Sequence, residues 1–214
     1  MSEAPLLEVR DVSRRFGRTW AVRRISLSVE PGRLVTLTGH NGSGKSTLLR
    51  LMAGALKPTE GEVVSFGSSI QSAGQRIAWL DHRPALYADL SGRENLEFWC
   101  ALAGHAVSQD SLDSALDRVG LAAVAHRRVR GYSRGMTQRL GLANVLLRRA
   151  DVWLLDEPST GLDVDGRETL ASLLSEALEA NKGVVTVTHN PAYLGSLVDV
   201  VHQLDKGRIK AVPS

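Results

Sequence analysis

Residues 39–46 read Gly39-His40-Asn41-Gly42-Ser43-Gly44-Lys45-Ser46, which has the form GxxxxGK[ST]. The apolar run at residues 34–38 predicts a buried strand before it, and residues 45–53 predict a helix that ends at Gly54. A glycine-rich turn between a strand and a helix places backbone N–H groups and the positive end of the helix around a phosphate. The stretch therefore predicts a site for a nucleoside triphosphate.

Each residue type in this stretch has a part in such a site. The ammonium group of Lys45 can neutralise the β- and γ-phosphates, and the hydroxyl of Ser46 can ligate Mg²⁺. The alternative is a glycine-rich turn with a chance lysine, which the predicted strand before it and helix after it disfavour. The residues expected to bind ATP are Gly39, His40, Asn41, Gly42, Ser43, Gly44, Lys45, Ser46 and Thr47.

A second apolar run, residues 152–155, ends in the acidic pair Asp156-Glu157. An acid at the carboxyl edge of a parallel strand lies beside the phosphate-binding turn, because the carboxyl ends of parallel strands share one edge. Asp156 is then expected to hold the Mg²⁺ shell, partly through water, and Glu157 to orient and polarise the attacking water. Taken alone, the acids could merely end a strand. Together with the phosphate site they favour hydrolysis over binding without turnover.

The rest of the chain predicts an α/β core with an inserted helical lobe. Residues 34–38, 152–155 and 184–188 are short apolar runs typical of a mostly parallel central sheet, with a helix at 165–180. Residues 6–12 and 25–29 predict an antiparallel pair, and residues 198–212 a hairpin. No strand is expected between about 84 and 150, where Ser91-Gly92-Arg93-Glu94 forms a capping box and helical patterns run to Gly104 and from 110 to Gly120.

The composition is that of an ordinary globular protein. The chain has 214 residues, 43% of them hydrophobic, and 26 Lys and Arg against 23 Asp and Glu give a net charge of +3. The single cysteine, Cys100, excludes an intramolecular disulfide and a CxxC site, which fits a reducing compartment. We expect neither a membrane span nor a secretory leader. The arginines are interleaved with acids, which favours a solvated surface over a basic face for lipid or nucleic acid.

Several further motifs resemble those of the ATP-binding-cassette (ABC) ATPases, and the resemblance covers nearly the whole chain. Tyr132-Ser133-Arg134-Gly135-Met136 resembles the family signature LSGGQ, with arginine and methionine at its third and fifth positions. The segment ending at Asp163 resembles the D-loop, and His189 is similar to the switch histidine. Phe16 resembles the aromatic residue that stacks on adenine, although a place in the core is the alternative.

The resemblance implies a P-loop NTPase of the ABC type with a mostly parallel central sheet, an antiparallel β lobe and an inserted helical subdomain. It implies one nucleotide-binding domain over residues 1–214, with a catalytic core at about 1–82 and 135–214 and a helical subdomain at about 83–134. In the family, the signature of one subunit closes on the nucleotide of another. A nucleotide-dependent homodimer, with Ser133, Arg134, Gly135 and Met136 contacting ATP in trans, is therefore expected, with Mg²⁺ as cofactor.

One position departs from the family pattern. His82 stands where the family normally has the glutamine of the Q-loop, at the end of the strand that leads into the helical lobe. Neutral imidazole is a poor ligand for Mg²⁺, so His82 is expected to act through water or hydrogen bonds. The expected catalytic residues are Glu157, His189 and His82.

A histidine at this position in a short cassette is similar to the ATPase subunits of haem exporters in cytochrome c maturation. The segments Asp163-Val164-Asp165-Gly166 and Glu94-Asn95-Leu96 resemble the same subfamily. The resemblance implies transmembrane permease partners and a peripheral place on the cytoplasmic face of the inner membrane, without specific nucleic-acid binding. The alternatives are an ABC-2-type exporter ATPase, a non-transport ABC clamp acting on nucleic acid, and a small-molecule kinase.

Overall fold

The computed structural model describes residues 4–70, 76–104, 106–189 and 191–210. The strands are β1 (Leu7–Phe16), β2 (Thr19–Val29), β3 (Leu34–Thr38), β4 (Glu60–Ser65), β5 (Ser68–Ser69), β6 (Ile77–Leu80), β7 (Val152–Asp156), β8 (Gly183–Val187), β9 (Val200–Asp205) and β10 (Arg208–Ile209). The α-helices are α1 (Lys45–Met52), α2 (Gly92–Leu102), α3 (Gln109–Arg118), α4 (Arg134–Leu147) and α5 (Val164–Glu179). Short 3₁₀ helices are η3 (Ala122–Val124), η4 (Val129–Gly131) and η5 (Pro191–Leu197).

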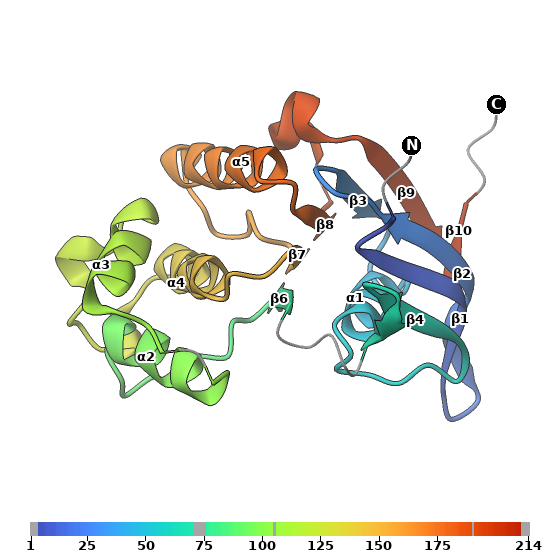
Figure 1. Cartoon of the computed structure of the whole chain (residues 1–214), viewed down its shortest axis with the longest axis horizontal. Coiled ribbons are helices and arrows are strands. Elements are labelled where there is room, and N and C mark those ends of the chain that lie inside the picture. The colour runs from blue at the N-terminus through green and yellow to red at the C-terminus, as the bar shows by residue number, and fades with distance from the viewer. Residues whose placement is uncertain (1–3, 71–75, 105, 190, 211–214) are drawn as a thin grey trace.

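The described strands form two sheets, which lie beside each other (Figure 1). The central sheet has the order β10-β9-β3-β8-β7-β6 and is parallel except for β10. Almost all residues of β3, β7 and β8 are buried, as the apolar runs predicted. The carboxyl ends of these strands meet at one edge of the sheet, which is the edge where α1 begins.

The second sheet is antiparallel and larger than predicted. Its order is β2-β1-β4-β5, and the expected pairing of β1 with β2 is confirmed. Neither β4 nor β5 was predicted. The predicted C-terminal hairpin is also confirmed, because β9 pairs with β10, while residues 211 and 212 lie outside the described part of the chain.

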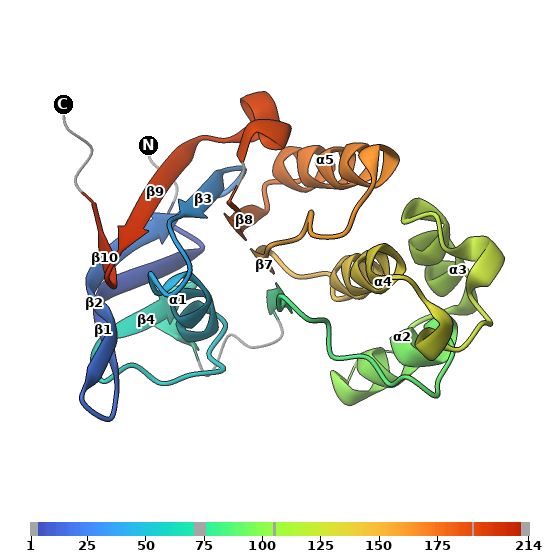
Figure 2. The ribbon, with the colours of Figure 1, turned by 180° about the vertical axis from the view of Figure 1, so that it is seen from behind.

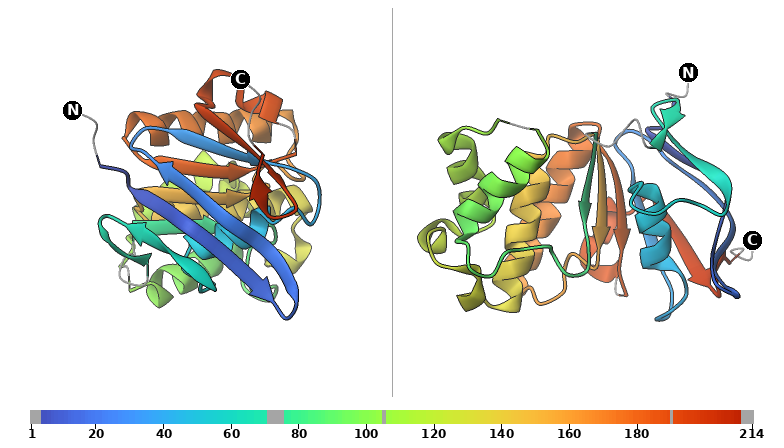
Figure 3. Two further views of the ribbon diagram at one scale, coloured as in Figure 1. Left: turned by 90° about the vertical axis from the view of Figure 1, so that its right-hand side faces the viewer. Right: turned by 90° about the horizontal axis from the view of Figure 1, so that it is seen from below.

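Two hydrophobic cores hold the layers together. One core packs α1 between the antiparallel sheet and the central sheet, and the other packs the central sheet against α2 to α5. Figure 2 shows the antiparallel sheet at one end of the molecule and α2 with α3 at the other. Figure 3 shows α1 between the two sheets. The central sheet is thus covered by α1 and the β lobe on one face and by helices α2 to α5 on the other.

The middle third of the chain is helical, as predicted. Among its described residues, β structure between positions 84 and 150 is limited to an isolated bridge of Ser91 with Arg128. The capping box at the start of α2 is confirmed: the Ser91 hydroxyl accepts the Glu94 N–H at 3.2 Å, and the Glu94 carboxylate accepts the Ser91 N–H at 2.7 Å. None of the helices within the described residues has the length and apolar character needed to cross a membrane.

Candidate functional site

The turn between β3 and α1 can be built only with glycine at its two ends. Gly39 has φ 142°, and a Cβ there would lie 2.3 Å from the carbonyl oxygen of Leu204. Gly44 has φ 108°, and its Cβ would lie 2.4 Å from the carbonyl oxygen of Ala21. Both conformations strain any L side chain, and both contacts are with backbone. The close approach of β2 and β9 therefore fixes the shape of this loop, for which phosphate binding is predicted.

Lys45 lies inside the loop and is only 7% exposed. Its Nζ donates to the carbonyl oxygens of Gly39 at 2.7 Å and His40 at 3.0 Å. Burial lowers the pKa of Lys45, and the negative charges of Glu157 and Asp156 oppose that shift. An ammonium group has three N–H donors, so one remains for a phosphate oxygen.

Asp156 ends β7 and is buried beside Ser46 on the first turn of α1. Burial raises the pKa of Asp156, whereas a hydrogen bond from the Ser46 hydroxyl lowers it. The two oxygen groups suit Mg²⁺, which binds few protein ligands and keeps waters and substrate phosphates as the others. The described residues contain no group of three or more His, Cys, Asp or Glu that could hold a metal. The Ser46 hydroxyl and the Asp156 carboxylate are the groups that fit a magnesium ion carried with the nucleotide.

Glu157 and His189 come together from the ends of neighbouring strands. The Glu157 N–H donates to the carbonyl of Val187 at 2.9 Å, which ties the end of β7 to the end of β8. His189 Nε2 lies 3.3 Å from Glu157 Oε1. Burial raises the pKa of Glu157, and the neighbouring His189 opposes this shift. A largely buried carboxyl with a raised pKa suits a group that accepts a proton from water.

A cavity of about 470 Å³ joins these groups. The predicted residues that line it are Asn41, Gly42, Ser43, Gly44, Lys45, Ser46, Thr47, His82, Asp156, Glu157 and His189. Three further lining residues, Ala21, Thr160 and Val187, were not predicted. Gly39 and His40 lie just before this set, and their carbonyl oxygens hold Lys45. The structure thus assembles the phosphate loop, the acid pair and both histidines around one space.

Phe16, at the end of β1, is 49% exposed, which excludes the alternative of a core position. The guanidinium carbon of Arg14 lies 4.8 Å from the centre of its ring. Phe16 is outside the set of residues that lines the cavity. Its stacking on adenine stays a prediction.

The signature segment starts α4, as predicted, with Ser133 as its N-cap. The Ser133 hydroxyl accepts the N–H of Met136 at 3.2 Å, and Met136 Sδ lies 3.5 Å from the Ser133 nitrogen. Methionine thus occupies the third helical position, where a capping box uses Glu or Gln. Ser133 and Arg134 line a separate cavity of about 550 Å³. The signature and the phosphate loop of one chain therefore face different spaces.

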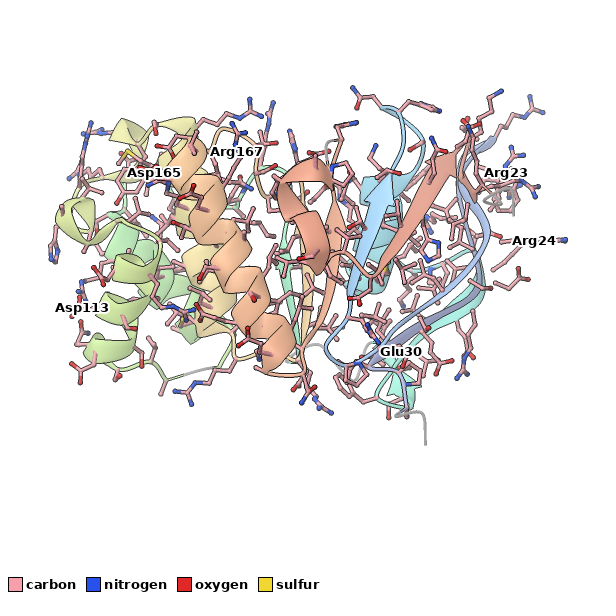
Figure 4. The ribbon with its side chains drawn as sticks, turned by 90° about the horizontal axis from the view of Figure 1, so that it is seen from above. Arg23, Arg24, Glu30, Asp113, Asp165 and Arg167 are labelled. Carbon is pink, nitrogen blue, oxygen red and sulfur yellow. The ribbon has the colours of Figure 1, made fainter. Side chains whose placement is uncertain are left out.

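Asp163 joins the signature helix to the next helix. Its carboxylate accepts the N–H of Gly166 at 3.0 Å, which caps α5, and forms an ion pair with Arg139 of α4. These two contacts lower the pKa of Asp163, the backbone hydrogen bond being the larger cause. Figure 4 shows Asp165 and Arg167 in the first turns of α5 that follow. Gly135 adds to the same junction, because a Cβ there would lie 2.6 Å from the carbonyl oxygen of Gly161.

His82 lies where the two cavities meet, because it lines both the phosphate-loop cavity and the signature-side cavity. Its backbone N–H donates to Asp81 Oδ1 at 2.9 Å. Gln138 of α4 is a further link that sequence reasoning missed, since its Nε2 lies 3.4 Å from the carbonyl oxygen of Glu157. The sequence signal that could have indicated this contact is the position of Gln138 directly after the signature segment.

The fold and the site together define a P-loop nucleoside triphosphatase with a helical lobe and a second, signature-type helix start. The sequence profile described as ABC transporter matches residues 22–160. This chain therefore belongs to the ABC transporter family, as the motifs indicated, and it is an ATP-binding, ATP-hydrolysing subunit.

Relatives of known sequence agree with this assignment. The cytochrome c biogenesis ATP-binding export protein CcmA of Nitrosomonas europaea is 34% identical over 95% of this chain and 96% of its own length. CcmA of Methylococcus capsulatus is 40% identical over 78% of this chain and 83% of its own. The uncharacterized ABC transporter ATP-binding protein YdbJ of Bacillus subtilis is 34% identical over 97% of this chain and 68% of its own.

Solved structures support the same fold. An ATP-binding subunit of an ABC transporter superposes with a TM-score of 0.87 at 26% identity, covering 96% of this chain and 88% of that one. The ATP-binding cassette MJ0796, in a dimeric post-hydrolysis state bound to ADP and Pi, gives a TM-score of 0.87 at 24% identity, covering 96% and 97%. The predicted fold class is confirmed.

Proposed function

We propose that this chain is the ATP-hydrolysing subunit of an exporter that serves cytochrome c biogenesis, with haem as the transported group. The observation that carries the proposal is His82 at the meeting point of the two cavities, in a chain whose relatives include CcmA proteins matched over nearly their full length. An imidazole at this position is the feature that we connect with haem exporters.

The proposed mechanism assigns a role to each group in the cavity. The loop from Gly39 to Thr47 binds the phosphates, with Lys45 neutralising their charge. Glu157 holds the attacking water and accepts its proton, and His189 beside it contacts the γ-phosphate. Ser46 and Asp156 would hold Mg²⁺, which supplies positive charge at the phosphates when ATP is bound. Phe16 stacks on the adenine.

We propose that two copies complete each other's sites. The separation of the signature cavity from the phosphate-loop cavity supports this arrangement, because a single chain leaves Ser133 and Arg134 away from its own nucleotide. In a two-fold homodimer, the signature residues Ser133 to Met136 of one copy and its Asp163 would face the ATP of the other. The amides at the start of α4 suit a phosphate.

The partner on the membrane side is proposed to dock on the helical subdomain, residues 83–134 of the single domain 1–214. Two exposed aromatic side chains form a cluster on its surface. Tyr87 and Phe98 are 49% and 37% exposed, and their ring centres lie 4.7 Å apart. Exposed apolar patches mark interaction sites. Permease subunits bound there would hold the chain on the cytoplasmic face of the inner membrane through protein contacts, with no nucleic acid involved.

The experiment that tests this proposal is a pull-down from native membranes with Glu157→Gln and ATP, followed by mass identification and haem absorbance. Two small polytopic subunits recovered with a haem-carrying component would support the proposal. A different permease without haem would contradict the cargo and favour the ABC-2-type exporter, the second candidate, because the segment from Tyr132 to Arg139 is similar to signatures common among those exporters. Recovery of nucleic acid and no permease would overturn the transporter function itself.

A further inference from the structure

His40, the second residue of the phosphate-binding loop, touches two oxygen atoms with its two ring nitrogens. Its Nδ1 lies 2.7 Å from the backbone oxygen of Asn41, and its Nε2 lies 3.0 Å from Oδ1 of Asp205 at the end of β9. Neither contact is explained by the roles assigned to the loop above.

The chemistry of these partners fixes the protonation state of the ring. A backbone carbonyl only accepts hydrogen bonds, and an ionised carboxylate only accepts as well. The hydrogen bond from His40 lowers the pKa of Asp205, so that carboxylate is ionised at neutral pH. Both ring nitrogens must therefore donate, and only the imidazolium form of histidine has two N–H donors.

We propose that protonated His40 and Asp205 form a latch that holds the phosphate-binding loop against the β9–β10 hairpin, and that loss of this proton loosens the loop and weakens ATP binding. A neutral imidazole has one N–H donor, so one of the two contacts is lost on deprotonation. Asp205 is a positioning residue in this arrangement, because it acts on the nucleotide through His40. The inference rests on the proposed role of the loop in binding phosphate.

The latch completes a continuous chain of contacts from the β lobe to the loop. The turn after β9 already donates the Gly207 N–H to the Ser43 carbonyl at 2.9 Å. On its other side, the Gly207 carbonyl accepts the N–H of Arg23 at 2.7 Å, and Figure 4 labels Arg23 at the outer edge of the molecule. A loosened hairpin would thus remove support from both the middle and the start of the loop.

Among the described residues, three lysines act on the latch pair. Lys45 from α1 disfavours a positive charge on His40, whereas Asp205 favours it. Lys210 Nζ lies 3.6 Å from Asp205 Oδ2, and Lys206 also acts on the Asp205 carboxylate. The contacts with Asn41 first and Asp205 second raise the pKa of His40 above the ordinary imidazole value. A raised pKa means that the latch is fully present at acidic pH and is lost as the pH rises through the His40 pKa.

The test is Asp205→Asn, which keeps the shape of the side chain and removes its charge. His40 is followed by NMR titration without nucleotide, its signal being identified by its loss in His40→Gln, and the ATP dissociation constant is measured from pH 6 to pH 8. We expect Asp205→Asn to move the His40 titration to lower pH and to weaken ATP binding about two- to fivefold near neutral pH, the range typical of an exposed ion pair. Asp117→Asn, on α3, is the matched control.

The double variant of His40→Gln with Asp205→Asn distinguishes loss of the His40–Asp205 contact from general damage to the loop. In the His40→Gln background, Asp205→Asn should have no further effect on ATP binding, because the partner is already absent. An unchanged His40 titration in Asp205→Asn, or an undiminished effect in the His40→Gln background, would overturn the latch. The ATP phosphates also titrate between pH 6 and pH 8, but they do so in every variant, so comparing the dissociation constants of the variants removes this contribution. A wild-type chain that binds no ATP would instead refute the proposed function, while the titration still reports on the latch.

Discussion

Glu157 combines a largely buried carboxyl with a histidine neighbour, and both follow strands whose positions the backbone fixes. Replacing it with Gln keeps the side-chain volume and removes the basic oxygen. We expect Glu157→Gln to bind ATP with an affinity close to that of the wild type and to hydrolyse it at least about 10²-fold more slowly, because a positioned base contributes that much. Steady-state phosphate release and equilibrium binding of ATP measure the two effects.

The matched control is Glu168→Gln on the exposed side of α5, which should leave turnover unchanged. Wild-type turnover in Glu157→Gln would show that another group handles the proton. Loss of ATP binding in the same variant would point to damage of the site rather than to lost catalysis.

Lys45 is predicted to act on affinity itself. Its ammonium group is buried in the loop and held by two carbonyl oxygens, so Lys45→Ala removes this positive charge from the loop. We expect ATP binding to fall by about 10-fold or more, since a hydrogen bond to a charged group contributes about 1.5–3 kcal/mol. Equilibrium dialysis of ATP checks this, with exposed Lys57→Ala as control. Undiminished binding in Lys45→Ala would refute the role of the loop.

His82 is predicted to separate basal activity from coupling. Because it lines both cavities, it contacts the nucleotide space without belonging to the phosphate loop. We expect His82→Gln to keep the ATPase rate of the isolated subunit within a few-fold and to change the stimulation of that rate by the permease. The comparison is ATPase activity with and without the membrane complex. Abolition of basal activity would instead show that His82 takes part directly in catalysis.

Among the secondary-structure elements, α2 depends on its capping box. Ser91 is 6% exposed, and its hydroxyl accepts a backbone N–H that would otherwise be unpaired. We expect Ser91→Ala to destabilise the chain by about 1 kcal/mol and to lower its Tm by about 2–4 °C. Thermal unfolding followed by circular dichroism measures this, with exposed Ser28→Ala on β2 as control. An unchanged Tm would show that the cap does not stabilise the folded state.

Elements that carry a local signal could be predicted from sequence. The buried strands β3, β7 and β8 are continuous apolar runs, and α2 and α5 begin at capping residues. By contrast, β4 begins with Glu60-Gly61-Glu62 and shows no alternation, because its position depends on pairing with β1 far away in the chain. Pairing over such distances leaves little trace in local composition.

The residues of the candidate site also divide into those that a local motif marks and those that become evident only in the fold. Residues of the phosphate loop, the acid pair and the switch histidine stand in short motifs, so the sequence indicated which of them share one cavity. Asp205 reaches the site from β9 through a single side chain that no motif marks. Gln138 stands directly after the signature, but its contact with the Glu157 carbonyl joins two elements that are apart in the sequence. Their contacts required the fold.

At the scale of the whole molecule, the two cavities define how copies would assemble. One copy presents its phosphate loop beside the β lobe and its signature beside the helical lobe. A two-fold arrangement would bring the signature of each copy to the nucleotide of the other, so ATP would hold the dimer together. Hydrolysis would then remove the γ-phosphate that both copies contact, which is how the site would drive movement of a permease.

The most direct test of this account is the molecular mass of Glu157→Gln in solution with and without ATP, measured by light scattering during gel filtration. We predict twice the mass of one chain with saturating ATP and Mg²⁺, and the mass of one chain with ADP or without nucleotide. Lys45→Ala combined with Glu157→Gln should stay at the mass of one chain. A Glu157→Gln chain that binds ATP and keeps the mass of one chain would contradict a nucleotide site shared between two copies.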